Sequence, residues 1–195
     1  MDLKGKRLIL GSHSPRRQEL LSGIGVEFTI DAENTFEETF PEDTPHELVP
    51  AMMSEGKSLG FHRQLEKDEL LLTSDTMVLC GKRIMGKPHS PEEAADMLRA
   101  LSGKWNEVIT AITLRDSERH LTCSDTARVH FKDLTEEEIS YYIEKCRPFD
   151  KAGAYGIQEW IGYIGIDSIE GSFFTIMGLP VHLVYSTLKE FLKED

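Results

Sequence analysis

The pattern of apolar and polar positions predicts alternating strands and helices along the first part of the chain. The mostly apolar run Arg7–Gly11 indicates a buried strand, and Ser14 followed by proline is typical of a helix start. That helix is expected to stop at one of the glycines at positions 23 and 25. Val26–Asp31 alternates apolar and polar side chains, as a second strand does.

An acidic stretch, Asn34–Thr44, separates this strand from the next predicted helix and is typical of a loop. The spacing of Thr44 and Glu47 is that of a capping box, which predicts a helix through about Gln64. Pro50 fits poorly inside such a helix, so we expect either a kink there or a later start.

The remaining pattern predicts a mixed α/β domain. Leu70–Ser74 is a further buried strand that ends at Asp75, so Asp75 is expected at a carboxyl end of the sheet. Beyond it we expect a hairpin at Met77–Cys80 and Arg83–Met85, a helix at Pro91–Leu101, a strand pair at Trp105–Leu114 and Arg119–Phe131, a helix from Thr135 to about Cys146, one or two strands within Asp150–Gly178, and a final helix from Pro180. The chain shows no internal repeat or linker, and we therefore expect one domain over residues 1–195, with two lobes around a cleft.

Composition narrows the class of protein. The 195 residues are 39% apolar and 29% charged, with a net charge of −12, which is typical of a soluble globular chain. This charge disfavours stable binding to nucleic acid or to an anionic membrane, because both partners require a basic surface. No apolar run is long enough to span a membrane, and Met1–Gly11 does not resemble a secretory signal. Three widely spaced cysteines fit neither a disulfide framework nor a metal-binding pair, so we expect a reduced, cytoplasmic protein.

The segment Ser12–Arg17 is the strongest candidate for binding an anion. If a helix opens at the proline, Arg16 and Arg17 lie in its first turn, where the helix dipole disfavours cations. A phosphate held there by backbone N–H groups, the hydroxyls of Ser12 and Ser14 and the guanidinium groups removes that conflict. An ordinary helix start with solvated arginines explains the same residues, and spacing alone leaves both interpretations open.

Carboxylates supply a second candidate site. Asp75, directly after an apolar strand, could bind a divalent cation or act as a general base toward water. Glu37 and Glu38 lie in the acidic loop, and one of them could complete a metal site with Asp75. The alternatives are an Asx turn at Asp75 and solvated side chains in the loop, and for a lone aspartate the turn is the commoner case.

Three further polar residues are candidates for ligand contacts. Lys87 precedes a proline and could reach a phosphate, and Lys57 lies on a predicted helix. Gln158 follows many small residues around Tyr155, and its amide carries both a donor and an acceptor for the edge of a base. For the two lysines the alternative is a solvated surface, and for the glycine-rich segment it is tight packing. The seven histidines show no zinc-binding spacing.

Taken together, these segments resemble the Maf family of nucleoside triphosphate pyrophosphatases over essentially the whole chain. The resemblance rests on LILGSHSPRRQELL at residues 8–21, SDTMVLCGKRIMGKP at 74–88, EEAADMLRALSGKWNEVITAITL at 92–114, and DKAGAYGIQEW with GSFFTIMGLP beyond it. It implies an α/β fold, with a mixed twisted sheet flanked by helices, related to that of the inosine triphosphatases. It also implies two lobes with a central cleft, often in a homodimer.

The resemblance further implies hydrolysis of a nucleoside triphosphate between the α and β phosphates, with a divalent cation such as magnesium, manganese or cobalt. The matching positions are, for catalysis, Asp75 as proton acceptor with Ser12, Arg17, Glu37, Lys57 and Lys87, and, for base specificity, Arg16, Thr76 and Gln158. Asp75 and Glu37 are the positions that would hold the cation. Arginine and glutamine at two of the specificity positions favour dTTP and UTP over 7-methyl-GTP.

Some positions depart from the family pattern, and a second function stays open. Gly11 and Ser74 replace frequent alanines, Glu159 stands where glycine is frequent, and Thr175 occupies a frequent asparagine position. Glu159 and Thr175 bear on base recognition more than on the reaction. The alternative function is a regulator of septum formation that binds nucleotides or nucleic acid without turnover, and the net charge of −12 disfavours duplex DNA as its ligand.

Overall fold

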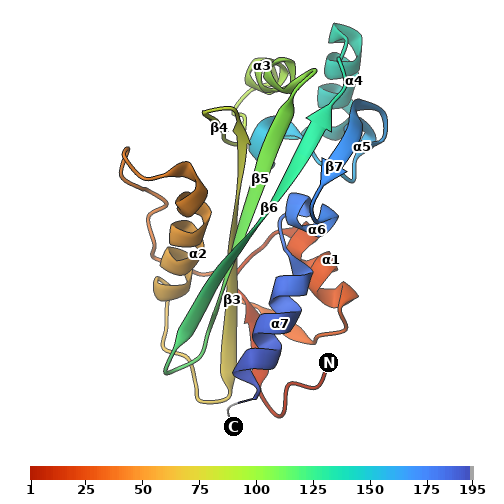
Figure 1. Cartoon of the computed structure of the whole chain (residues 1–195). Helices are drawn as coiled ribbons and strands as arrows, with labels where there is room; N and C mark the ends of the chain where they lie inside the picture. Colours follow the sequence, from red (N-terminus) through yellow and green to blue (C-terminus); the bar gives the residue numbers. More distant parts are fainter. Residues whose placement is uncertain (194–195) are drawn as a thin grey trace. The chain divides into compact units, whose positions relative to one another are not determined.

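The computed structural model describes residues 1–193 and has a mixed α/β fold (Figure 1). Seven strands form one sheet in the order β2-β1-β3-β5-β6-β7, and β4 pairs with β3. The strands are β1 (Arg7–Leu10), β2 (Phe28–Ile30), β3 (Glu69–Cys80), β4 (Arg83–Met85), β5 (Trp105–Arg115), β6 (His120–Phe131) and β7 (Ile166–Glu170). The helices are α1 (Pro15–Gly23), α2 (Val49–Leu59), α3 (Pro91–Leu101), α4 (Glu136–Cys146), α5 (Trp160–Gly165), α6 (Phe173–Met177) and α7 (Val181–Phe191), with single 3-10 turns at His46–Leu48 and Ala152–Ala154.

The sheet combines parallel and antiparallel pairs. β1 lies between β2 and β3 and is parallel to both, with Leu8 opposite Phe28 and Leu70. β4 is antiparallel to β3, and β7 is antiparallel to β6. β3, β5 and β6 are 12, 11 and 12 residues long, and a short turn joins β5 to β6.

Contacts divide the chain into two compact units. Unit 1 comprises Met1–Asp75, Thr110–Asp125 and Gly178–Asp195, and unit 2 comprises Thr76–Ile109 and Thr126–Met177. Within unit 1, α2 lies on one flank of β3, and α1 and α7 lie on the other (Figure 1). The three long strands run through both units, so each unit contains part of the sheet.

Each unit buries apolar side chains of its own. In unit 1, Ile9 and Leu71 from adjacent strands pack with Phe61 and Leu65. In unit 2, α3 packs against α4 and buries its apolar face, including Leu98 and Leu101. Tyr142 and Phe131 are the largest fully buried side chains in unit 2, and the burial of such rings contributes strongly to stability.

The predicted helix starts are confirmed where the capping side chains form their bonds. The Ser90 hydroxyl accepts a hydrogen bond from the Glu93 amide at 3.1 Å, at the start of α3. At the start of α4, Thr135 and Glu138 form both bonds of a capping box. The predicted starts of α1 and α7 are confirmed as well, although the Ser14 hydroxyl at the head of α1 makes no capping bond.

The helix predicted from Thr44 to Gln64 is wrong at both ends. A 3-10 turn at His46–Leu48 intervenes, and α2 itself begins at Val49 and ends at Leu59. Pro50 lies in the first turn of α2, where its missing N–H has no helical acceptor to lose. Of the two outcomes expected from Pro50, the structure therefore has the later start rather than the kink.

One strand prediction changes and two are confirmed. β3 does not end at Asp75 but continues to Cys80, and so includes the predicted strand Met77–Cys80, whose hairpin pairing with Arg83–Met85 is confirmed. The glycine-rich region Asp150–Gly178 contains one strand, β7, and also the short helices α5 and α6, which the apolar pattern does not predict.

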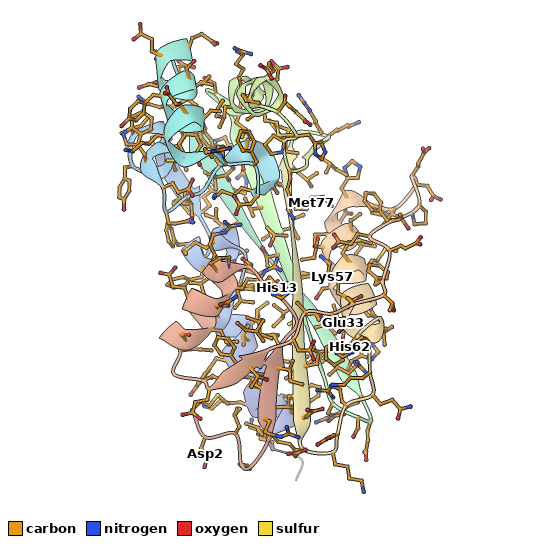
Figure 2. The ribbon with its side chains drawn as sticks, turned by 180° about the vertical axis from the view of Figure 1, so that it is seen from behind. Asp2, His13, Glu33, Lys57, His62 and Met77 are labelled. Atoms are coloured by element: carbon orange, nitrogen blue, oxygen red, sulfur yellow. The ribbon has the colours of Figure 1, made fainter. Side chains whose placement is uncertain are left out.

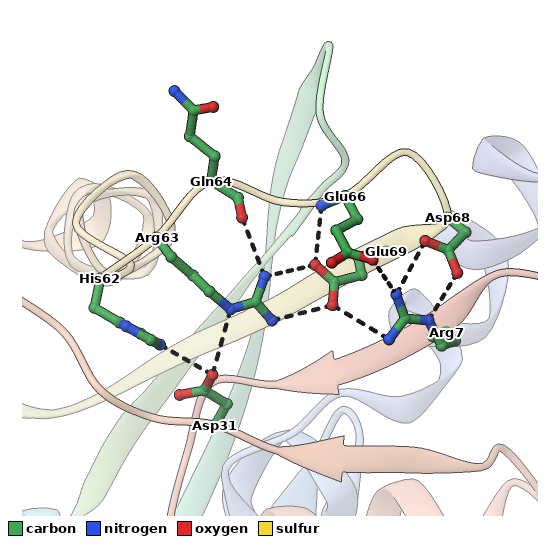
Figure 3. A network of polar contacts seen from close by, with 8 residues as sticks. All are labelled: Arg7, Asp31, His62, Arg63, Gln64, Glu66, Asp68 and Glu69. Carbon is green, nitrogen blue, oxygen red and sulfur yellow. Dashed lines mark hydrogen bonds and ion pairs between the residues drawn. The ribbon is translucent and has the colours of Figure 1, made fainter.

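The amino ends of β1 and β3 carry an ionic network (Figure 3). Arg63 binds the buried carboxylate of Glu69 through two nitrogens, at 2.6 and 3.0 Å. Arg7, opposite Glu69 in the parallel register, binds Asp68 at 2.7 Å and lies 3.5 Å from Glu69. The hydrogen bonds from Arg63 hold the pKa of Glu69 below its usual value.

Candidate active site

The turn between β1 and α1 positions a charged side chain inside unit 1. The Arg17 Nε donates to the carbonyl of Gly178 at 2.9 Å, and its Nη1 donates to the Ser12 hydroxyl at 3.3 Å. That hydroxyl also accepts from the backbone N–H of Ser14 at 3.2 Å, which fixes the turn. Ser12 is buried, so this predicted anion-binding segment is a formed structure rather than a fully solvated helix start.

The electrostatics around Arg17 connect it to acidic groups of the same unit. Burial is the largest influence and lowers the pKa of Arg17, and the neighbouring charge of Arg16 lowers it further. The carboxylates of Asp75 and Glu38 act in the opposite direction and stabilise the guanidinium. Four charged candidates from the sequence therefore interact electrostatically in unit 1: the cations Arg16 and Arg17 and the anions Glu38 and Asp75.

A lysine lies between two carboxylates beside this cluster. The Lys57 Nζ, on α2, donates to Asp75 Oδ1 at 2.7 Å and lies 3.1 Å from Glu38 Oε1. Figure 2 shows Lys57 on the same flank as His62 and Glu33. Lys57 and Asp75 are both largely shielded from water, with side chains 19% and 18% exposed, which strengthens their attraction. The sequence-based alternative of a solvated lysine is thus not what the structure shows.

Asp75 lies inside a strand and not at its end, which corrects the expected position. β1 stops at Leu10, which pairs with Leu72, while β3 continues past it. Asp75 therefore lies just beyond the carboxyl end of β1, and its side chain faces Lys57 without an Asx turn being needed. Because β1 is shorter than β3, the carboxyl end of β1 lies beside Asp75 and provides the edge at which parallel sheets bind ligands.

The acidic loop brings Glu38, and not Glu37, to the lysine. Glu37 is exposed, and its carbonyl accepts from the Thr39 amide at 2.8 Å. The loop is tied to α2 through the Asn34 side chain, which donates to the carbonyl of Lys57, and through the Thr35 amide, which donates to Gly60 O at 2.9 Å. Within residues 1–193, no three His, Cys, Asp or Glu side chains are grouped so that they could hold a metal ion by themselves.

Unit 2 contains two further predicted residues on connected loops. Lys87 is exposed in the loop after β4, and the carbonyl of the preceding Gly86 accepts from the Gly153 amide at 3.0 Å. Gly153 belongs to the segment that leads to Gln158, so the two loops are joined through their backbones. Thr76, which follows Asp75 in β3, also belongs to unit 2.

Gln158 has an unused hydrogen-bond acceptor beside a surface hollow. Its Oε1 is buried, and it is the one buried side-chain polar atom of residues 1–193 that finds no partner. The hollow has a volume of about 380 Å³ and is bounded by Gln158, Tyr163, Phe173 and residues 166–169. Buried polar atoms in folded proteins almost always have a partner, so an exception at the wall of a hollow points to a ligand.

Tyr155, by contrast, is a packing residue. Its hydroxyl donates to Asn106 Oδ1 at 2.9 Å, and its ring meets Phe131 edge-on at 5.0 Å between centroids. The small residues around it allow this close packing, which was one of the two interpretations of the glycine-rich segment. Sequence reasoning did not find the contacts of Tyr142 and Glu159 in this region, although the departure from glycine at position 159 was a signal.

These features define an α/β protein with a half-buried arginine, a lysine–carboxylate centre and an open acceptor beside a hollow. The Maf-like protein family matches residues 7–191. The chain therefore belongs to the Maf family, as its sequence motifs predict. Within residues 1–193, no helix combines the length and the apolar character needed to cross a membrane.

Several relatives are similar along nearly their whole length. A protein of Porphyromonas gingivalis named dTTP/UTP pyrophosphatase is 46% identical over 194 residues, covering 97% of this chain and 96% of its own. A protein of Bacteroides thetaiotaomicron with the same name is 44% identical, covering 94% and 95%. The solved structure of a HAM1 protein from Coxiella burnetii is 14% identical with a TM-score of 0.40, over 65% of this chain and 73% of that one.

Proposed function

We propose that this chain hydrolyses dTTP and UTP between the α and β phosphates, releasing the nucleoside monophosphate and pyrophosphate. The observation that carries the proposal is the ion-paired set of Asp75, Lys57 and Glu38, whose two carboxylates also act on the charge of the half-buried Arg17. The names of the full-length relatives support the same substrates. We place this activity in the cytoplasm, as nucleotide-pool housekeeping by a single Maf-like domain, with a homodimer as the expected assembly.

The proposal assigns the binding of the triphosphate to basic groups. A free triphosphate carries a charge of about −4, which the chain must offset with cations and N–H donors. Arg17, Lys57 and Lys87 supply the charges, and the first turn of α1 supplies backbone N–H groups. Ser14 supports this role, because its hydroxyl does not cap the helix.

A divalent cation fits the carboxylates of unit 1. Asp75 and Glu38 both lie against the Lys57 ammonium, so the two carboxylates converge on one point of unit 1. Magnesium is commonly bound by one or two carboxylates together with substrate phosphates, which matches two acidic groups without a third. We propose Asp75 and Glu38 as the protein ligands, Glu38 taking the role that the family resemblance gave to Glu37. When bound, the cation lowers the pKa of water and offsets charge on the phosphates.

Hydrolysis at the α-phosphorus needs one general base that takes a proton from water. It also needs cationic groups that offset the negative charge of the phosphates. Asp75 accepts a proton from a water molecule, whose oxygen attacks the α-phosphorus. The bond from this phosphorus to the bridging oxygen breaks, and pyrophosphate leaves with that oxygen. Arg17 and Lys57 stabilise the charge that gathers on the phosphate oxygens in the transition state, and no covalent enzyme intermediate forms.

Base recognition is assigned to Gln158, with Arg16 and Thr76 at the other two family positions. Uracil and thymine carry a ring N3–H donor, whereas cytosine has an acceptor at the same place. The unused Oε1 of Gln158 is an acceptor and suits the N3–H of the two proposed bases. A base without a donor at this place leaves the buried acceptor unpaired, and the site therefore rejects that base strongly.

The test is pyrophosphate release from a panel of nucleoside triphosphates with magnesium, manganese or cobalt, for wild type and Asp75→Asn. We expect wild type to prefer dTTP and UTP, and we expect Asp75→Asn to lower kcat by about 10²–10⁴-fold while nucleotide binding changes little. Asp43→Asn, at an exposed position of the acidic loop, is the matched control.

Three outcomes would change the proposal. Near-normal activity of Asp75→Asn would remove Asp75 from catalysis. Preference for another base would keep the reaction and overturn the role of Gln158. Tight nucleotide binding by wild type without turnover would return the chain to the regulatory function.

A further inference from the structure

One buried phenol binds residues on both sides of Gln158, the backbone of Gly156 and the side chain of Glu159. The Tyr142 hydroxyl accepts a hydrogen bond from the Gly156 amide at 3.0 Å and donates one to the Glu159 carboxylate. Tyr142 lies on α4 and is fully buried. Because residues 156 and 159 are both tied to the same oxygen, the two residues between them have little freedom to shift.

A buried lysine binds the oxygen of the Glu159 carboxylate that Tyr142 does not bind. The Lys151 Nζ lies 2.9 Å from Glu159 Oε1 and 2.7 Å from Asp150 Oδ1. The Lys151 side chain is only 9% exposed, so its ammonium depends on these carboxylates for the solvation that it loses. Glu159 therefore binds an ammonium with one oxygen and a phenol with the other.

The backbone near Glu159 packs closely against the Glu159 side chain. A Cβ on Gly156 would lie 2.8 Å from Glu159 Cδ, so only glycine leaves room for the carboxylate. At Gly153, φ is 71°, which allows the tight turn between Lys151 and Tyr155. The segment between Lys151 and Glu159 is thus fitted around one carboxylate.

The side chain of Gln158 contrasts with this held backbone. Its neighbours use their polar groups within unit 2, whereas its Oε1 stays unpaired at the wall of the hollow. Burial and the bond to Glu159 raise the pKa of the Tyr142 hydroxyl far above neutral pH, so Tyr142 keeps its proton as a donor. A fixed backbone with one free acceptor is the arrangement expected of a group that reads a ligand.

We propose that Tyr142, Lys151 and Glu159 form a bracket that positions Gln158 and thereby sets the preference for bases with a ring N–H donor. This inference rests on the proposed function and adds three positioning residues that do not touch the substrate. Glu159 is the residue that joins the other two.

The test compares kcat/KM for UTP and CTP in wild type, Glu159→Gln and Tyr142→Phe. Glu159→Gln removes the charge that Lys151 requires, and Tyr142→Phe removes the oxygen shared by residues 156 and 159. We expect the ratio of kcat/KM for UTP to that for CTP to fall about tenfold, through a higher KM for UTP, while kcat for UTP stays within about threefold. Glu144→Gln, at an exposed position of the same helix as Tyr142, is the control and should leave the ratio unchanged.

The outcomes separate this inference from the function on which it rests. Wild-type turnover of UTP with an unchanged ratio in both folded variants would overturn the bracket alone. Wild type without turnover of any nucleotide would overturn the proposed function and the bracket with it. If Glu159→Gln does not fold, Tyr142→Phe decides the question, because it removes one oxygen atom and keeps the ring in place.

Discussion

Arg17 holds its positive charge at a half-buried position of unit 1. The cost of this burial is offset by the Gly178 carbonyl, the Ser12 hydroxyl and the carboxylates of Asp75 and Glu38. Because guanidinium stays protonated even when burial lowers its pKa, the residue is a permanent cation at the proposed phosphate site. It also has several donors in one plane, so bonds to the protein leave others for a ligand.

This geometry predicts that Arg17→Lys is not a conservative change. A lysine ammonium cannot reach the Gly178 carbonyl and the Ser12 hydroxyl with separate nitrogens and still face a phosphate. We expect kcat/KM for UTP to fall by about 10–100-fold in steady-state pyrophosphate-release assays. Arg83→Lys, at an exposed position of β4, should remain within about twofold of wild type. Equal activities of the two variants would show that Arg17 acts only as a point charge.

At the level of single residues, the sequence identified the charged residues that meet in unit 1 better than it identified their partners. Asp75, Lys57 and Arg17 were identified through their motifs, and the structure brings all three into unit 1. The choice between Glu37 and Glu38 could not be predicted, because it depends on the path of a loop whose acidic residues look alike in sequence. The contacts of Tyr142 could not be predicted either, since a buried tyrosine on an amphipathic helix has the same sequence pattern as an ordinary core residue.

Among the elements, the packing of the acidic loop on α2 decides where Glu38 lies. The Phe36 ring rests on two glycines of that helix region, and a Cβ on Gly56 would overlap it. A Cβ on Gly60 would lie 2.7 Å from Phe36 Cβ. With the Asn34 and Thr35 bonds to the same helix, this contact fixes the loop directly above Lys57.

The contact predicts an unusual response to a helix-favouring substitution. Gly56→Ala would ordinarily stabilise a helix by about 0.5–1 kcal/mol, but here the new methyl group meets the Phe36 ring. We expect a net destabilisation of about 1–3 kcal/mol, measured as a lower Tm. Gly23→Ala, in α1, is the control, because its Cβ would meet nothing within 4 Å.

A second substitution tests whether contact with the Phe36 ring causes the loss of stability in Gly56→Ala. Replacing Phe36 with leucine in the Gly56→Ala background should recover part of the lost Tm, because the smaller side chain leaves room for the methyl group. No recovery in the double variant would place the strain elsewhere and would remove Phe36 as the residue that seats the loop.

Elements with local signals were predictable, and those fixed by distant partners were not. α3 and α4 begin at capping residues whose bonds form as the sequence indicates. α2 was predicted too long, since the capping spacing at Thr44 competes with Pro50, six positions beyond the predicted start. β3 was predicted as two separate strands, because the polar residues Asp75 and Thr76 interrupt its apolar pattern, whereas the pairing of Met77–Cys80 with Arg83–Met85 was predicted and is confirmed.

For the molecule as a whole, the net charge of −12 makes paired carboxylates important for stability. Glu69 is the clearest case, with a side chain only 4% exposed and two bonds from Arg63. Its pKa is lowered in the folded chain, so the folded state holds this carboxylate ionised to lower pH than the unfolded state does. The stabilisation is complete above the unfolded pKa of about 4.3, and it is lost as the pH falls through the lower folded pKa.

We therefore expect Glu69→Gln to lower the free energy of unfolding by about 1–3 kcal/mol at pH 7, and by less at pH 3. Urea-unfolding curves of wild type and variant at both pH values measure the two differences. Glu66→Gln removes a partner of Arg7 whose side chain is 69% exposed, and it should change little at either pH. A difference between wild type and Glu69→Gln that is the same at pH 3 and pH 7 would show that Glu69 titrates alike in both states.

The division of the chain into units has a consequence for its synthesis. Unit 2 is complete once the ribosome has added Met177, whereas unit 1 also requires the stretch that begins at Gly178 and contains α7. The Lys4 ammonium donates to the carbonyl of Leu192, 188 positions further along the chain, at 2.6 Å. A nascent chain therefore presents an unfinished unit 1 until α7 has been made, and a premature stop within α7 leaves a product that cellular proteolysis can recognise as incomplete.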